Sequence, residues 1–187
     1  ALATRGGYGL TRLLDAIDWA RVAGSVERGT RWVGQSALTA LHLHENQIHD
    51  LAPLASLTGL TTLGLNNNRV SDLGPLSGLT KLERLGLDGN RIQSVTPLSG
   101  LTNLTYLRLS YNQVSDLAPL SGLTRMTSLF LMGNQVSNAA PLSGLTAMTG
   151  LWLNDNQIAD LTPLTGLTNL AQLGLGHNRI VDLAPLS

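Results

Sequence analysis

Histidines and carboxylates that lie close together are the first candidates for metal binding, and one such group stands near residue 44. The stretch LHLHEN places His42 and His44 two residues apart, with Glu45 beside them. Residues two apart in a strand point to the same side, so both imidazoles would share a face. Two histidines and a carboxylate are a known zinc ligand set. These three residues are therefore a candidate metal site; the alternative is a polar, pH-sensitive end of a surface.

Catalytic motifs are missing from the sequence. It contains no nucleophile elbow, phosphate-binding loop or HExxH motif, and the glycine-rich GGYG at residues 6–9 has no strand before it. Most carboxylates recur at a fixed step, which indicates a structural role in a turn rather than an acid–base pair. We expect no enzymatic activity and no cofactor.

The fixed step belongs to an internal repeat. All seven prolines are 22 residues apart, from Pro53 to Pro185, and seven asparagines keep the same step from Asn46 to Asn178. The unit reads LxxLxLxxNx(I/V)xxLxPLxxLTx, in six full copies from Leu38 to Asn169 and a partial seventh from Leu170 to Ser187. Such a period is typical of solenoid proteins, in which each unit buries its apolar face against its neighbours.

Each repeated position has a physical role. In LxL the two leucines point into the coil, and the residue between them points out. The asparagine amide can satisfy backbone groups where the chain leaves the strand. Aspartate at the thirteenth position can accept hydrogen bonds from the following turn. Proline then favours a short 3-10 turn over a full helix.

The unit resembles the leucine-rich repeat, and the stretch DLxPLxxLT with a 22-residue period is most similar to bacterial internalins. The resemblance implies an α/β solenoid, with a parallel sheet on the concave face and 3-10 turns on the convex face. It also implies an N-terminal helical cap, a secreted or cell-surface bacterial protein, and a host or cell-surface protein as partner. Cytoplasmic location is the alternative.

The two ends of the chain depart from the repeat. We expect residues 1–37 to hold a tail and a helical cap, with a helix from Thr11 to about Gly24, and residues 38–187 to be the leucine-rich repeats. The last strand, with Leu173 and Leu175, would have a bare edge, so the natural chain continues or a partner covers it. Self-association through this edge is a possible role.

Function is expected at the outward positions of the repeat. All four aromatic residues after residue 37 fall there, and Arg108, Phe130 and Trp152 would form a row across three neighbouring strands. These residue types are enriched at protein interfaces. Gly64, Gly86 and Gly174 have no side chains and would leave the surface shallower on either side of the row. We predict a partner-binding patch made of Tyr106, Arg108, Tyr111, Phe130, Met132, Trp152 and Asp155.

Other classes of function are weighed against this one. Twelve basic and twelve acidic residues give no net charge, and hence no electrostatic signature of nucleic-acid binding. No apolar run is long enough for membrane insertion. A structural protein that multimerises through solenoid ends or faces, and a glycan binder that stacks sugars on the aromatic rings, are the two alternatives to protein recognition.

Overall fold

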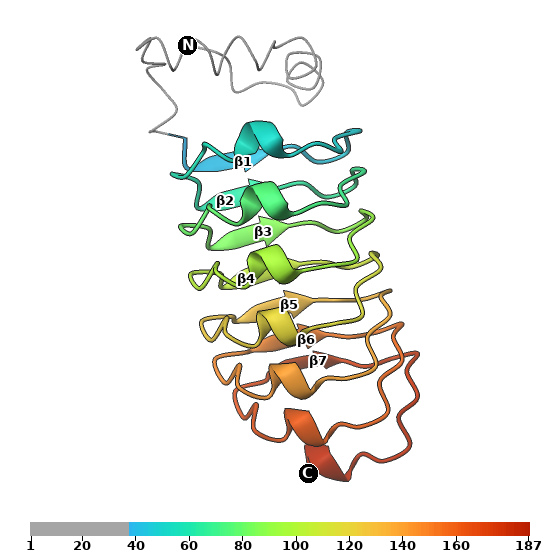
Figure 1. The fold of residues 1–187 in the computed structure, drawn as a ribbon. Helices are drawn as coiled ribbons and strands as arrows, with labels where there is room; N and C mark the ends of the chain where they lie inside the picture. The colour runs from blue at the N-terminus through green and yellow to red at the C-terminus, as the bar shows by residue number, and fades with distance from the viewer. Residues whose placement is uncertain (1–37) are drawn as a thin grey trace, which may run out of the picture.

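The computed structural model describes residues 38–187, which form seven stacked coils (Figure 1). Each coil contributes a three-residue strand and a three-residue 3-10 helix. The strands are β1 Ala40–His42, β2 Thr62–Gly64, β3 Arg84–Gly86, β4 Tyr106–Arg108, β5 Ser128–Phe130, β6 Gly150–Trp152 and β7 Gln172–Gly174. The 3-10 helices are η2 Ala52–Leu54, η3 Gly74–Leu76, η4 Thr96–Leu98, η5 Ala118–Leu120, η6 Ala140–Leu142, η7 Thr162–Leu164 and η8 Ala184–Leu186. The predicted tail and helical cap lie outside the described residues.

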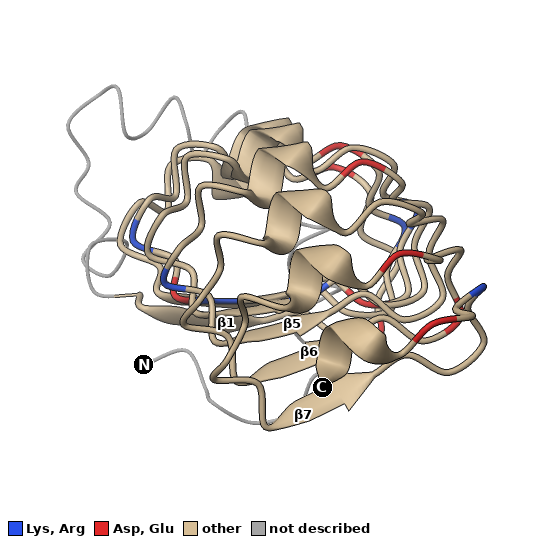
Figure 2. Cartoon of the chain, turned by 90° about the horizontal axis from the view of Figure 1, so that it is seen from below, with Lys and Arg blue, Asp and Glu red and all other residues tan. Residues whose placement is uncertain are grey.

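The strands form one parallel sheet in sequence order, from β1 to β7. Every pairing joins residues 22 apart, so each strand position continues as a straight column across the sheet. The sheet makes one wall of the coil and the 3-10 helices make the opposite wall (Figure 2). The predicted solenoid is confirmed, and the repeat period sets the register of the whole sheet.

Aliphatic side chains fill the space between these walls. The strand leucines Leu85, Leu107 and Leu129 are fully buried, as are the leucines that follow strands β2 to β6. Aromatic residues are absent from the buried apolar core of residues 38–187. Burial of a leucine side chain stabilises the fold by about 1.5–3 kcal/mol relative to exposure. The leucine columns are therefore what holds successive coils together.

The repeated asparagine closes each coil and ties it to the previous one. The Nδ2 of Asn112 donates to the carbonyls of Leu109 at 3.0 Å and of Leu87, in the previous coil, at 2.9 Å. Its Oδ1 accepts from the N–H of Ile92 at 2.9 Å. The predicted role of asparagine is confirmed, because the amide satisfies buried backbone groups that have no water to bond.

The thirteenth position of the unit accepts a hydrogen bond from the first residue of the 3-10 helix that follows. Asp116 Oδ1 accepts from the N–H of Ala118 at 2.8 Å, and proline is the second residue of the helix. Hydrogen bonds from Thr162 lower the pKa of the equivalent Asp160. Asn138 makes the same contact at 2.9 Å where aspartate is missing. The residue type varies, whereas the need for an acceptor does not.

Apolar side chains of the seventh coil are exposed. Val181, Leu183 and Leu186 have 96%, 65% and 45% of their surface accessible, and Leu173 is half-buried. The equivalents of Leu173, Leu183 and Leu186 in the middle coils are buried, whereas the position of Val181 is exposed in every coil. Each coil thus depends on a neighbour on either side to cover its leucines. In the described part of the chain, no helix is long and apolar enough to cross a bilayer.

Candidate functional site

The predicted site lies on the outer face of the sheet, which we call the strand face. Tyr106 and Arg108 on β4, Phe130 on β5 and Trp152 on β6 alternate with buried leucines and therefore point away from the core. All four are half-buried. These four side chains thus partly cover one another, and each keeps part of its surface accessible to solvent.

Three aromatic rings lie against one another on this face, and we call them the aromatic row: Tyr106, Phe130 and Trp152. The rings of Phe130 and Trp152 are parallel, with centroids 4.0 Å apart and planes at 3°. Tyr106 meets Phe130 at 5.3 Å, with the planes tilted by 53°. Register explains the stack, because Phe130 and Trp152 are partners in the β5–β6 pairing. Arg108 pairs with Phe130 in the same way between β4 and β5.

Two guanidinium groups flank the aromatic row. The Arg84 guanidinium carbon lies 4.2 Å from the centroid of the Tyr106 ring, and that of Arg108 lies 5.1 Å from the Phe130 ring. A cation over an aromatic face within about 6 Å is attracted by the ring quadrupole. The two guanidinium groups therefore lie beside the row on strands β3 and β4.

Asp88 holds one of these arginines in place. Arg108 Nε donates to Asp88 Oδ2, while Asp88 Oδ1 accepts from the backbone N–H of Ser110 at 2.8 Å. Burial by itself would lower the pKa of Arg108, but the charge and hydrogen bond of Asp88 outweigh it and raise the pKa. The Asp88 side chain is 11% exposed and that of Arg108 is 42% exposed. The ion pair therefore has a buried carboxylate and an accessible guanidinium.

Trp152 is also supported from below by a glycine. A Cβ on Gly150 would lie 2.5 Å from Cη2 of the indole. No side chain larger than hydrogen fits there unless the indole moves. The indole thus lies over Gly150 with one face against Phe130, and its other face points towards β7.

Tyr111, Met132 and Asp155 lie at the margin of this arrangement. Tyr111 and Asp155 occupy the turn after the strand, with φ of 57° and 56°. Tyr111 is 59% exposed, and its ring lies over Gly133, where a Cβ would be 2.6 Å from Cδ1. Met132 is half-buried in the column before that turn. The structure thus gathers the strand aromatics and separates Tyr111 from their stack.

The three glycines that were expected to leave the surface lower beside the row each have a polar side chain close to them. A Cβ on Gly64 would meet the His44 ring at 2.2 Å, and one on Gly86 would meet Asn66 Oδ1 at 2.9 Å. On β7, Asn154 Oδ1 lies 2.3 Å from the corresponding point on Gly174. Each glycine lets a polar side chain from an earlier position lie flat on the sheet.

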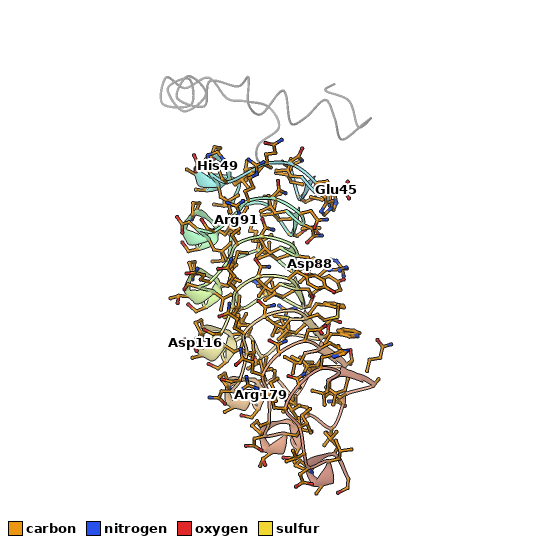
Figure 3. The ribbon with its side chains drawn as sticks, turned by 90° about the vertical axis from the view of Figure 1, so that its right-hand side faces the viewer. Glu45, His49, Asp88, Arg91, Asp116 and Arg179 are labelled. Atoms are coloured by element: carbon orange, nitrogen blue, oxygen red, sulfur yellow. The ribbon has the colours of Figure 1, made fainter. Side chains whose placement is uncertain are left out.

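The candidate metal ligands are not assembled as a trio. The His42 and His44 rings lie close together, with centroids 5.5 Å apart. Glu45 sits in the turn with φ of 57°. Across residues 38–187, no group of three or more His, Asp or Glu side chains is placed to hold a metal ion. Figure 3 shows Glu45 and Asp88 on the strand side of the coil, with His49 and Asp116 near the 3-10 helices.

Arg84 and Asp88 belong to the site but were not predicted from the sequence. A usable signal was present: Arg84 stands 22 residues before Tyr106 and pairs with it in the sheet. Asp88 stands 22 residues before Ser110, whose N–H it accepts. Both residues occupy outward positions in the coil that precedes the first aromatic residue of the row, so the repeat pattern could have identified them.

Comparison with protein families gives two matches. The family model "Leucine Rich repeats (2 copies)" matches residues 36–78, 58–100, 102–144 and 146–187. The model "LD-carboxypeptidase N-terminal domain" matches residues 1–56. Of that second match, residues 38–56 form the strand and 3-10 helix of the first coil, and the remainder lies outside the described residues. No curated protein matches the chain closely enough to count as a relative.

Solved structures resemble the chain over most of its length. An internalin C2 (inlC2) from Listeria monocytogenes has 41% sequence identity and a TM-score of 0.80, over 81% of this chain and 67% of its own. An internalin (inlF) from the same species has 37% identity and a TM-score of 0.78, over 81% of this chain. The chain spans only 45% of that internalin.

A more distant structure shares the fold. TLR13, solved as a complex with ssRNA13, has 28% identity and a TM-score of 0.65, over 76% of this chain and 23% of its own. The repeat model covers nearly all of residues 36–187, and the internalins match these coils at 37% and 41% identity. The chain therefore belongs to the leucine-rich repeat family, as an internalin-like member.

Proposed function

We propose that this chain is a non-enzymatic recognition module that binds a partner protein on its strand face. The aromatic row and Arg108 form the centre of the binding surface, and Tyr111, Met132 and Asp155 lie at its margin. The observation that carries the proposal is the Phe130–Trp152 stack, whose ring centroids are 4.0 Å apart, on the outer face of a sheet whose buried side is aliphatic. Tyr, Trp, Phe and Arg are the residue types that dominate interface energetics.

Pre-organisation supports this reading. The indole is held between Phe130 and the floor at Gly150, and Arg108 is held by Asp88. Immobilising a flexible side chain on binding costs about 0.5–1.5 kcal/mol of conformational entropy. Side chains that are already ordered in the free protein avoid most of this cost. A partner would meet the ring edges of the row, the outer face of Trp152 and the exposed part of the Arg108 guanidinium.

The source of the partner is part of the proposal. Similarity to internalins supports a bacterial protein that is secreted or displayed at the cell surface, with a host or cell-surface protein as its ligand. The zero net formal charge supports a protein rather than a nucleic acid as that ligand. Residues 38–187 would act as the recognition part, through surface contact alone.

The test selects a partner from a displayed library of extracellular protein domains, using the wild-type chain as bait. The selected domain is then measured against Phe130→Ala and against Gln113→Ala, an exposed polar residue outside the row. We expect Phe130→Ala to weaken binding at least about tenfold, since anchors at interface centres contribute 2 kcal/mol or more. Equal binding by both variants would contradict the proposal.

Self-association is a second candidate, favoured by the exposure of Leu183 and Leu186 in the seventh coil. Sedimentation velocity over a range of concentrations separates the two functions. A monomer at all concentrations removes the assembly role. An oligomer that Leu183→Glu dissolves, with no effect of Phe130→Ala, supports assembly instead. The glycan alternative is tested by a glycan array, on which protein recognition predicts no signal.

A further inference from the structure

A second cluster on the strand face lies at the opposite end from the aromatic row. His42 ends β1 and His44 follows it by two residues, so both side chains leave the sheet on the same side. Their rings are 5.5 Å apart and tilted by 33°, and both residues are exposed. Neither imidazole has a hydrogen-bond partner within residues 38–187. Their nitrogen lone pairs are therefore available to an outside ligand.

The floor beneath the two rings is a glycine. The point where residue 64 would carry a Cβ lies 2.7 Å from His44 Nε2 and 3.2 Å from His42 Nδ1. Two nitrogens from different rings thus converge on one small region above β2. Gly64 itself is buried, which shows that the rings lie over it. Any other residue in this position would displace the His44 ring.

We propose that His42 and His44 form a two-histidine site for a divalent transition-metal ion, with His42 Nδ1 and His44 Nε2 as the ligands. Nitrogens bound to one tetrahedral zinc ion at about 2.0–2.1 Å lie roughly 3.3 Å apart, and His42 Nδ1 and His44 Nε2 both lie within 3.2 Å of the same point above Gly64. Water fills the remaining coordination positions. Glu45 is not counted as a ligand, because no group of three or more His, Asp or Glu side chains within residues 38–187 is placed to hold a metal ion.

The donor chemistry sets which ions bind. Imidazole nitrogen suits Zn²⁺, Ni²⁺ and Cu²⁺, whereas Mg²⁺ and Ca²⁺ require oxygen ligands. The Irving–Williams order predicts tighter binding of Cu²⁺ than of Zn²⁺.

Isothermal titration calorimetry of the full 187-residue chain with Zn²⁺ and Cu²⁺ tests the site. We expect one ion per chain, with no heat from Mg²⁺. His42→Ala and His44→Ala should each lower the affinity about tenfold or more, since even outer-shell changes at metal sites cost 10–100-fold. His49→Ala and His177→Ala, which remove exposed histidines elsewhere, should leave the affinity unchanged. In histidine ¹⁵N spectra, Zn²⁺ should shift His42 Nδ1 and His44 Nε2.

A glycine variant tests whether the positions of the two histidine rings matter for metal binding, as well as their presence. Gly64→Ala keeps both histidines but places a Cβ 2.2 Å from His44 Cε1, so the imidazole must move. We expect weaker Zn²⁺ binding and a nearly unchanged free energy of unfolding. Gly78→Ala, whose Cβ meets open space, is the matched control. Binding that survives His42→Ala or His44→Ala, or ¹⁵N shifts confined to other histidines, would overturn the proposal.

Discussion

At the scale of single residues, the binding surface depends on a few side chains that hold others in place. Asp88 joins Arg108 to the backbone N–H of Ser110, and Gly150 gives the Trp152 indole a floor. Neither Asp88 nor Gly150 would meet a partner as its main contact. Their effect on recognition is indirect, through the position of the guanidinium and of the indole.

The two partners of the ion pair should differ in their effect on stability. Asp88→Ala leaves the buried N–H of Ser110 without its acceptor, which costs about 1–3 kcal/mol of the free energy of unfolding. Arg108→Ala removes a side chain that is 42% exposed, and should cost less than about 1 kcal/mol. Urea denaturation of both variants measures the difference. Equal losses would show that Asp88 acts only through Arg108.

The row could be predicted at this scale, but its detail could not. The 22-residue step placed Arg108, Phe130 and Trp152 on neighbouring strands, and the pairing confirms it. The step says nothing of rotamers, so it missed that Asn66 and His44 lie over glycines and that Tyr111 turns towards Gly133. Side-chain directions depend on the space that neighbours leave, which a repeat pattern does not contain.

At the scale of the coil, polar residues perform structural work that is repeated in every unit. The asparagine amide ties two coils together, and the acceptor at the thirteenth position starts each 3-10 helix. Both roles were predicted from spacing, because a turn that leaves a buried strand always exposes unpaired backbone groups. Local chemistry of this kind recurs wherever the repeat does.

Asn112→Ala removes only a small side chain but should destabilise the protein strongly. It removes hydrogen bonds to three carbonyls and leaves the buried N–H of Ile92 unpaired. We expect a loss of about 2–4 kcal/mol, from more than one unsatisfied buried group at about 1–3 kcal/mol each. The neighbouring exposed Gln113→Ala should change the free energy by about 0.5 kcal/mol or less. A small loss for Asn112→Ala would mean that water replaces the amide.

The positive φ in the turn after each strand was not predicted from the sequence. Glu45, Asn67, Gly89, Tyr111, Gly133, Asp155 and His177 all have positive φ. Glycine, asparagine and aspartate in one column are a signal for this backbone conformation. Glutamate and tyrosine in the same column concealed it, because backbone hydrogen bonds, such as that from Tyr111 N–H to Met132 O at 2.6 Å, hold a turn that these residue types disfavour alone.

A pair of glycine variants tests the turn. Gly133→Ala places a Cβ on a residue with φ of 64° and 2.6 Å from the Tyr111 ring, so we expect a loss of about 1–2 kcal/mol. Gly144→Ala has open space around its Cβ and should be neutral or slightly stabilising. Thermal unfolding of both variants gives the comparison. Similar melting temperatures would argue against strain in the turn.

At the scale of the whole molecule, stability comes from contacts between neighbouring coils. Middle coils are covered on both sides, while the seventh coil exposes Leu183 and Leu186. Such a solenoid behaves as a one-dimensional array in which position along the chain sets the effect of a change. The fold was predictable at this scale because one repeat unit determines the rest. The residues outside the repeat carried no such signal.

Equivalent leucines should therefore contribute unequally. Leu129 on β5 is fully buried, and Leu129→Ala should cost about 2–5 kcal/mol. Leu173 on β7 occupies the same column but is half-buried, so Leu173→Ala should cost less than half as much. Hydrogen exchange should likewise be slower in β5 than in β7. Equal losses would contradict a stability built from neighbouring coils.

The central claim is that Trp152 belongs to a binding surface rather than to the core. The most direct measurement is the Kd of a selected partner domain for Trp152→Ala, together with the free energy of unfolding of that variant. We predict that the Kd rises about 30-fold or more, equivalent to 2 kcal/mol, while the protein loses only about 0.5–1.5 kcal/mol from the lost ring stack. An unchanged Kd, or a loss of stability as large as that of a core leucine, would contradict the claim.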